Sequence, residues 1–465
     1  MNIDRENTLL ARQANYYASL GTDDIPGGVM EKARRVLMDF LCETAAGYKE
    51  GELASISIDY LKETGGGQEA TILCDGTKLP APWTALAMGI MAHSIELDDG
   101  HRWGTSHPAV AVIPAVLAMG EKSGSSFSEI LKGIVIGYDA MLRAARAINP
   151  SHLKRGFHST GTCGAIGAAA GCASIAGLPS DKFAYAMSMG GLQSAGLQEM
   201  LHDHPGIKPL QPGKAALAGV LSTELALRGA KSPRTLFEGQ HGWLKAMCDG
   251  EYSEEGLMGD LGTRWEILLT YTKLYPTCRH CHAAIDLARE AKKTLECTER
   301  DVESIKIRTY RLGIVEVGQV FLPSNFEEAM FSMPFSLALA LRTGNVTLQD
   351  YTPELLADEE LRRVASAVTI EEDERMNALY PEERGAWMSL VLKDGRTFEK
   401  GIPVAKGEPE NPVIDRDLME KLTAMLAPYY PEEFVTGLWK ICVESDVEAV
   451  AYGDILDHFG RFHKP

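Results

Sequence analysis

The chain has 465 residues, of which 45% are hydrophobic and 24% are charged. This length exceeds what one hydrophobic core usually supports, so two domains are expected, and the composition is that of a globular rather than a disordered protein. The formal net charge of −18 disfavours nucleic acid and anionic membranes as the main partners.

The beginning of the chain is polar and mixed in charge, and it lacks the apolar region of a secretory signal. No stretch is long and apolar enough to predict a membrane span. The nine cysteines are scattered along the chain, as is typical of reduced thiols. We therefore expect a soluble, cytoplasmic protein.

Up to about residue 265 the pattern is helical and rich in small residues. Between Val29 and Leu41, apolar residues repeat at intervals of three and four, which marks one buried helix face. The run from Thr162 to Ala176 (TCGAIGAAAGCASIA) is small or apolar on every side and predicts a helix that is buried all round. Its glycines do not follow the G-x-G-x-x-G spacing, so close helix packing is favoured over a phosphate loop.

The pattern changes near residue 300, where alternating runs predict strands. Val302 to Val317 contains one such run, and Ala365 to Glu371 is another. Met388 to Gly401 predicts a hairpin whose turn is Asp394-Gly395. Helices are expected from Pro334 to Leu341, after Ser332, and from Asp417 to Ala427.

These elements predict a mainly α protein. An all-helical domain is built from both chain ends, residues 1–268 and 405–465. A smaller α+β domain, residues 269–404, is inserted between them as a lid.

A first cluster of possible proton carriers lies between two strongly apolar runs. Its members are His93, Glu96, Asp98, Asp99, His101 and His107. Carboxylates and imidazoles bind many divalent ions, but no H-E-x-x-H or comparable spacing is present, which disfavours a metal site. The apolar flanks favour a position at the edge of the core over a solvated loop.

His158 lies just before the predicted small-residue helix, for which Ser159 or Thr160 is a credible N-cap. The positive end of a helix favours a bound anion and a neutral imidazole, which is a useful state for a general base. Taken alone, a histidine at such a position is more often a hydrogen-bonded structural residue.

Two lysines repeat this arrangement. Lys208 precedes a helix expected from about Lys214, and Lys273 precedes one expected from about His280. Each lysine taken alone is expected to be a surface charge. Together with His107 and His158, they would place four helix starts around one cavity, which could hold a polycarboxylate despite the negative net charge.

The run Cys278-Arg-His-Cys281-His282 has the spacing of a haem c attachment site. Without an export signal or a second Cys/His pair, a helix start with two buried thiols is favoured. The chain also lacks a G-x-S-x-G elbow and a P-loop, which disfavours serine-nucleophile and phosphoryl-transfer chemistry.

In their order along the chain, these clusters resemble the MmgE/PrpD family of 2-methylcitrate dehydratases, cis-aconitate decarboxylases and iminodisuccinate epimerases. The matching stretches are MAHSIELDDGH, SHPAVAVIPAVLAMGE, RGFHSTGTCGAIGAAAG, KPLQPGKAALAGVLSTELALRGA, KLYPTCRHCHAAID and FSMPFSLALAL. They lie between residues 91 and 341, and weaker likeness extends over nearly the whole chain. The resemblance implies a helical domain with a smaller α+β lid, a homodimer, and catalysis without a metal or an organic cofactor.

The resemblance also implies roles for individual residues. The expected catalytic residues are His158, His107 and Glu96. The residues expected to bind substrate are Lys208, Lys273, Arg155 and Asp99. No residue is expected to bind a cofactor or a metal.

Three departures from the decarboxylase branch that the chain resembles disfavour decarboxylation: Gly100 stands in place of Thr, Cys278 in place of His and Phe335 in place of Tyr. The sequence therefore predicts a cofactor-independent hydro-lyase acting on a small di- or tricarboxylate, such as a 2-methylcitrate-like hydroxy acid. The alternatives are a cofactor-free epimerase or decarboxylase of a related polycarboxylate, and a non-catalytic carboxylate-binding protein.

Overall fold

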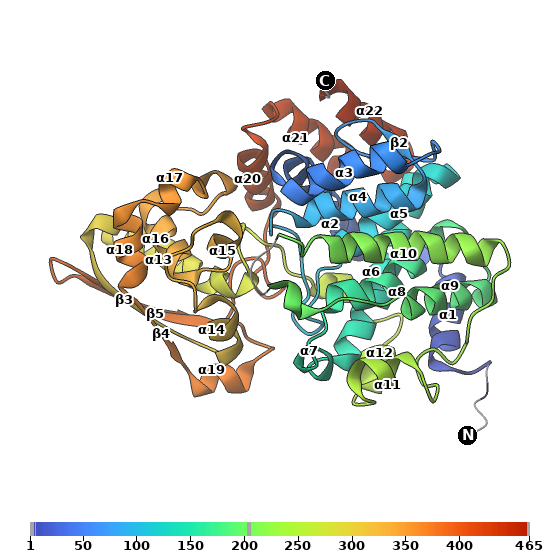
Figure 1. Ribbon diagram of the computed structural model, residues 1–465, viewed down its shortest axis with the longest axis horizontal. Helices are drawn as coiled ribbons and strands as arrows, with labels where there is room; N and C mark the ends of the chain where they lie inside the picture. Colours follow the sequence, from blue (N-terminus) through green and yellow to red (C-terminus); the bar gives the residue numbers. More distant parts are fainter. Residues whose placement is uncertain (1–3, 5, 202–205, 463–465) are drawn as a thin grey trace. The chain divides into compact units, whose positions relative to one another are not determined.

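The computed structural model describes residues 4, 6–201 and 206–462 of the chain. It divides into two compact units (Figure 1). The helical unit comprises Met1–Thr270 and Leu426–Pro465, and the inserted unit comprises Tyr271–Met425. The prediction of a helical domain built from both chain ends around a smaller α+β insertion is confirmed.

The second boundary differs from the expected one. The inserted unit ends at Met425 rather than at residue 404, because it includes nearly all of helix α20 (Asp415–Leu426). Lys406 Nζ lies 3.0 Å from Asp417 Oδ2, and this ion pair ties α20 to the segment that leads into it.

The helical unit contains one short antiparallel hairpin, β1 (Ala70–Thr71) with β2 (Lys78–Leu79). Its helices are α1 (Leu9–Ser19), α2 (Gly27–Glu50), α3 (Glu52–Thr64), α4 (Ala81–His93), α5 (Ala109–Ser123), α6 (Phe127–Ile148), α7 (Ser151–Lys154), α8 (Ser159–Ile175), α9 (Ser180–Leu192), α10 (Leu210–Leu227), α11 (Trp243–Cys248), α12 (Glu254–Met258), α21 (Glu432–Trp439) and α22 (Tyr452–Phe462).

Helix α8 lies at the centre of the helical unit, where it packs against α5, α6, α9 and α10. Every residue of α8 except Ser174 is buried, as its composition predicts. A Cβ atom added to Gly167 would lie 2.4 Å from Met141 Cβ, and one added to Gly219 would lie 2.4 Å from Ala168 Cβ. Glycine therefore permits the close approach of α6 and α10 to α8, as expected from the sequence.

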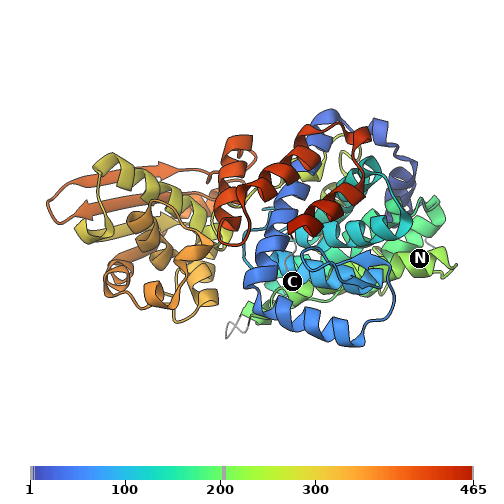
Figure 2. The same ribbon diagram turned by 90° about the horizontal axis from the view of Figure 1, so that it is seen from above.

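The two chain ends meet in the helical unit through α2. The predicted apolar face of this helix, from Val29 to Leu41, is buried. Arg34 on α2 donates hydrogen bonds to the carbonyl oxygens of Cys442 and Ser445. Figure 2 shows the red C-terminal helices beside the blue N-terminal ones.

The inserted unit contains a four-stranded sheet in the order β4-β3-β5-β6, in which β3 pairs parallel with β4 and antiparallel with β5. The strands are β3 (Val302–Thr309), β4 (Val368–Glu372), β5 (Ala386–Leu392) and β6 (Thr397–Ile402). The other helices of this unit are α13 (His282–Leu295), α14 (Arg311–Val317), α15 (Phe326–Met330), α16 (Met333–Thr343), α17 (Pro353–Leu356), α18 (Glu359–Ser366) and α19 (Glu374–Leu379). Helix α13 packs against β5 and β6, and α16 packs against α13.

The hairpin between β5 and β6 is confirmed, and Gly395 in its turn has a φ of +88°. Ser332 caps α16 as expected, because its hydroxyl accepts the Phe335 N–H. The strand expected within Val302–Val317 is confirmed as β3, and the strand expected from Ala365 is shorter than predicted. The first ends at Thr309, where α14 follows with the Arg311 N–H donated to Asn377 Oδ1, and the second begins only at Val368, because Ala365 belongs to α18.

Among the described residues, no helix has both the length and the apolar character needed to cross a membrane.

The packing of α8 predicts a stability effect. Gly167→Ala places a methyl group against Met141 and the Gly137 carbonyl oxygen, so we expect the free energy of unfolding to fall by about 1–3 kcal/mol, the usual cost of overpacking. The matched control is Gly453→Ala at an exposed position of α22, where nothing in the described chain lies within 4 Å of the new Cβ. Urea unfolding followed by circular dichroism measures both, and equal midpoints would contradict the close approach.

Candidate active site

The loop between α4 and α5 carries the first predicted cluster, and it folds inward. Five of the six predicted proton carriers are buried: His93, Glu96, Asp98, Asp99 and His101. His101 holds the loop together, because its Nδ1 accepts the Gly104 N–H and its Nε2 lies 3.1 Å from Glu266 Oε2. Burial alone would raise the pKa of Glu266, but the contact with His101 and the charges of Arg146 and Arg264 lower it to about 2. His101 therefore has a structural role.

Asp98 lies between two imidazoles. Its Oδ1 is 3.0 Å from His93 Nδ1, and its Oδ2 is 3.0 Å from His107 Nδ1. His107 Nδ1 also lies 2.7 Å from the carbonyl oxygen of Asp99. A carbonyl oxygen can only accept, so Nδ1 of His107 carries a hydrogen and Nε2 holds the lone pair of the neutral ring.

Asp99 is held by two groups of the protein. Its Oδ1 accepts the Ala109 N–H at the first turn of α5, and its Oδ2 accepts the Tyr138 hydroxyl hydrogen. Burial raises the pKa of Asp99 to about 7, although both hydrogen bonds favour the charged form. Both oxygens of Asp99 thus accept hydrogen bonds from the protein, one of them from an N–H at the start of α5, and its expected contact with a substrate stays a prediction.

His158 is itself the N-cap of α8, so the prediction that Ser159 or Thr160 occupies this position is wrong. The His158 carbonyl oxygen accepts the N–H groups of Gly161 and Thr162, which begins the helix. Burial lowers the pKa of His158 to about 3, and the nearby His93 and His107 lower it further. The ring is therefore neutral near pH 7, and burial is the largest of the causes.

A glutamine fixes the His158 ring. His158 Nδ1 lies 2.7 Å from Gln211 Oε1, and Gln211 Nε2 donates to the carbonyl oxygen of Leu197. The loop that carries His107 joins the same region, because the His107 N–H donates to Thr160 Oγ1 at the start of α8. The structure thus brings the starts of α5, α8 and α10 together.

Lys208 lies just before α10 and donates a hydrogen bond to Glu96. Burial lowers the pKa of His93 to about 3, and the charge of Lys208 lowers it further, so the lysine lies close to the histidine pair. Glu96 has a φ of +52°, a left-handed conformation that costs a glutamate roughly 1–2 kcal/mol. The helical unit thus gathers His107, His158, Lys208 and Glu96 in one region.

Lys273 belongs to the inserted unit and is fully buried there. Burial lowers the pKa of His280 and His282 well below the usual value, and the charges of Arg279 and Lys273 add to this effect. Arg279 Nη1 lies 3.0 Å from His282 Nδ1, and Arg279 Nε donates to Glu408. The inserted unit therefore holds a buried group of positive charges around Lys273.

The C-x-x-C-H run begins a helix, as predicted. Cys278 is the N-cap of a short 3₁₀ turn, Arg279–Cys281, and α13 follows at His282. Cys281 is fully buried, and burial raises its thiol pKa well above the usual value. Cys278 is only half-buried, so the expectation of two buried thiols is correct for one of them.

Arg155 does not join the group. Its side chain is exposed, and its guanidinium lies 5.8 Å from the ring centroid of Phe157. Its charge lowers the pKa of His152 and of Cys248, each as a minor cause beside burial. Over residues 4, 6–201 and 206–462, no three His, Cys, Asp or Glu side chains are grouped as a metal site would need.

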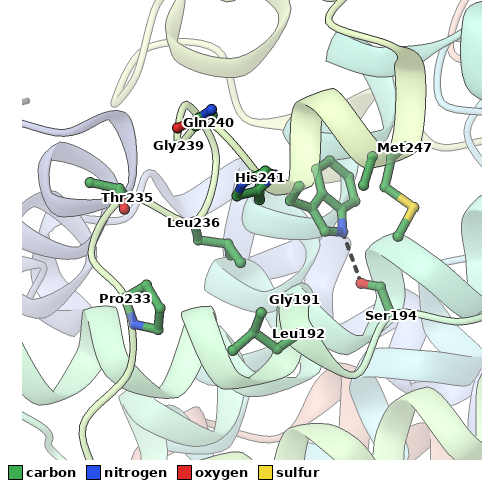
Figure 3. A pocket seen from close by; sticks show the side chains of 13 residues that line it. Gly191, Leu192, Ser194, Pro233, Thr235, Leu236, Gly239, Gln240, His241 and Met247 are labelled. Atoms are coloured by element: carbon green, nitrogen blue, oxygen red, sulfur yellow. Dashed lines mark hydrogen bonds between the residues drawn. The ribbon is translucent and has the colours of Figure 1, made fainter. Parts of the chain in front are cut away.

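A cavity of about 450 Å³ opens elsewhere on the helical unit, between the end of α9, the loop before α11 and α11 itself (Figure 3). The residues that line it include none of the predicted site residues, all of which the structure describes. Its wall is connected to α8, because Trp243 Nε1 donates to Ser194 Oγ and Ser194 Oγ donates to the Thr162 carbonyl oxygen.

Sequence reasoning named His93 and Asp98 as possible proton carriers without giving them a role at the site, and it did not select Gln211. The first two lie within the recognised cluster, but nothing in a linear sequence distinguishes Asp98, which contacts two imidazoles, from Asp99, which caps a helix. Gln211 lies three residues after Lys208, inside the stretch KPLQPGK. Its closeness to a selected lysine was the signal in the sequence that could have identified it.

Comparisons with known proteins agree with this organisation. Residues 11–255 match the MmgE/PrpD N-terminal domain, and residues 275–441 match the MmgE/PrpD C-terminal domain. Cis-aconitate decarboxylase of Homo sapiens is 26% identical over 431 residues, which cover 89% of this chain and 86% of the relative. The mitochondrial 2-methylcitrate dehydratase of Yarrowia lipolytica is 28% identical over 162 residues, 33% of this chain and 30% of the relative.

The cis-aconitate decarboxylase of Aspergillus terreus strain NIH 2624 is 26% identical over 298 residues, which cover 61% of this chain. The chain spans about three fifths of the length of this relative, since the match covers 60% of it.

The buried histidines predict acid sensitivity. His158 has a pKa of about 3 when folded and an ordinary value of 6.5, so between these pH values only the unfolded chain takes up the proton. Stability is therefore lost as pH falls below 6.5, by up to about 1.4 kcal/mol per pH unit for each such group. We expect His158→Gln to reduce the slope of unfolding free energy against pH by about this amount.

Urea unfolding at a series of pH values from about 4.5 to 6.5 measures this slope. The matched control is His241→Gln, which replaces an exposed histidine. Equal slopes for the wild type and His158→Gln would show that His158 does not fold as a buried neutral ring.

Proposed function

The chain belongs to the MmgE/PrpD family, and on that premise we propose that it is a cofactor-independent hydro-lyase acting on a small di- or tricarboxylate. The relatives are named as decarboxylases of cis-aconitate and dehydratases of 2-methylcitrate, so both named substrates are polycarboxylates. A 2-methylcitrate-like hydroxy acid is the substrate class that we favour.

The observation that carries the proposal is the pair of histidines whose Nδ1 protons are fixed. His107 Nδ1 faces Asp98 and the Asp99 carbonyl oxygen, and His158 Nδ1 faces Gln211. Each ring then presents its Nε2, which can accept a proton when the ring is neutral and donate one when the ring is protonated. Two such rings and a lysine within one region are the groups that removal of water beside a carboxylate requires.

In the proposed reaction, His158 Nε2 removes a proton from the carbon beside a substrate carboxylate. The electron pair moves into a new C=C bond as the bond from the adjacent carbon to the hydroxyl breaks. His107 protonates the departing hydroxyl, so that water leaves. Positive charge on Lys208 stabilises the negative charge that builds up on the carboxylate.

The surroundings suit these two assignments. Burial keeps His158 neutral before substrate binds, and the negative charge of a bound polycarboxylate would raise its pKa from about 3 towards the working range. The Asp98 carboxylate, 3.0 Å from His107 Nδ1, stabilises the positive charge that His107 carries when both of its nitrogens are protonated. His158 is therefore the proposed base and His107 the proposed acid.

Decarboxylation is the less favoured alternative, although cis-aconitate decarboxylases are among the relatives. Phe335 is fully buried at the start of α16, and its ring has no hydroxyl to donate where the resembling branch has tyrosine. A cofactor-free epimerase would use the same pair of histidines without loss of hydroxyl. A homodimer, implied by the family resemblance, is part of the proposal.

His158→Gln should lower kcat by about two to four orders of magnitude, because acid–base catalysis usually contributes that much. Steady-state rates with the best substrate of a citrate, methylcitrate, malate and aconitate panel measure the effect. The matched control His241→Gln changes an exposed residue outside the histidine cluster and should keep the wild-type rate. A His158→Gln enzyme with wild-type turnover removes this residue from the mechanism.

The products distinguish the three reactions. We expect proton NMR in D2O to detect an alkene formed from a hydroxy acid, with all carboxylates retained. Deuterium uptake into recovered substrate or its epimer without alkene would support the epimerase, and loss of a carboxylate would support the decarboxylase. Thermal stabilisation by these carboxylates without any turnover would support a binding protein.

A further inference from the structure

We propose that Gln211 is a positioning residue that fixes the Nδ1–H tautomer of His158 and so makes Nε2 its basic nitrogen. The tautomer itself is a property of the folded chain. Its effect on turnover rests on the proposed function, in which His158 is the base.

The direction of the hydrogen bonds determines the tautomer. Gln211 Nε2 donates to the Leu197 carbonyl oxygen, which can only accept. The other amide atom of Gln211 is therefore Oε1, and it lies 2.7 Å from His158 Nδ1. An amide oxygen also only accepts, so the hydrogen between the two groups belongs to His158.

Two glycines leave room for this amide. A Cβ atom added to Gly196 would lie 2.9 Å from Gln211 Oε1 and 3.0 Å from the His158 carbonyl oxygen. A Cβ atom added to Gly161 would lie 3.3 Å from Gln211 Oε1. Larger residues at these positions would press on the amide oxygen, so the backbone around His158 is shaped to admit Gln211.

The same turn of chain positions Gln211 and Lys208. The Gln211 N–H donates to the Lys208 carbonyl oxygen, and α10 begins between them at Leu210. The His158 N–H donates to the Gly196 carbonyl oxygen, which adjoins Leu197, the partner of the Gln211 amide. Three hydrogen bonds therefore join the start of α10, the segment at 196–197 and the start of α8.

Without this acceptor, a neutral imidazole can place its hydrogen on either nitrogen. A ring with its hydrogen on Nε2 cannot remove a proton through that atom. Because burial keeps His158 neutral near pH 7, the tautomer rather than the charge decides which nitrogen is basic.

The first test reads the tautomer directly. In protein labelled with ¹⁵N at histidine, we expect the wild-type His158 ring to show the Nδ1–H pattern at pH 7, assigned by its loss in His158→Gln. Gln211→Leu should shift the signals to the Nε2–H or a mixed pattern. Gln211→Glu should keep the Nδ1–H pattern, because a carboxylate still accepts from Nδ1. Wild-type protein in the Nε2–H form, or Gln211→Leu in the pure Nδ1–H form, would overturn the proposal.

A third variant of Gln211 controls for misfolding. Gln211→Met has nearly the same shape as glutamine but a far weaker acceptor, so it should change the tautomer while the circular dichroism and unfolding midpoint stay close to those of the wild type. An unchanged tautomer in a folded Gln211→Met protein also counts against the proposal.

Kinetics then separate positioning from a merely structural role. We expect Gln211→Leu to lower kcat by about 10- to 100-fold, as is usual when a group that orients a reacting histidine is lost, with KM changed by less than about threefold. Gln211→Glu should recover activity and move the acidic limb of the pH profile to higher pH, because its negative charge favours the protonated ring. If wild-type protein turns over no carboxylate, the proposed function fails, but the NMR result still decides the role of Gln211.

Discussion

The close packing of α6 and α10 against α8 is the constraint on which the candidate site depends. It requires glycine at Gly167 and Gly219, and it places the N-terminus of α8 inside the helical unit rather than at its surface. Burial of His158 follows from this position, and burial is the main cause of its low pKa. The neutral state that the proposed mechanism requires of this histidine therefore depends on the small residues of α8.

Much of the fold could be predicted because its signals are local. The buried face of α2, the small-residue composition of α8 and the Asp394-Gly395 turn each reflect the burial or the turn at that position. The start of the second strand at Val368 was misplaced because the alternating pattern continues into Ala365, which belongs to α18. The end of the inserted unit depends on packing of α20, which periodicity does not report.

The candidate site was predictable in its residue types but not in their roles. Asp98 and Asp99 are adjacent and chemically identical, yet one contacts two imidazoles and the other caps a helix. Which side of the chain each aspartate faces depends on the loop conformation, in which Glu96 adopts a left-handed φ. Arg155 is only three residues from His158, but its side chain is exposed.

The hydrogen bond between Lys208 and Glu96 has a consequence for ligand selection. Within the proposed function, an arriving carboxylate meets an ammonium group that already has an anionic partner, so binding is an exchange of one anion for another. The electrostatic contribution to binding is then the difference between the contact of Lys208 with the ligand and its contact with Glu96. This difference is small for a singly charged acid that makes no further contacts. A ligand with several carboxylates can compensate for the lost contact between Lys208 and Glu96 through its other carboxylates. Within the proposed function, Glu96 therefore disfavours the binding of small monoanions.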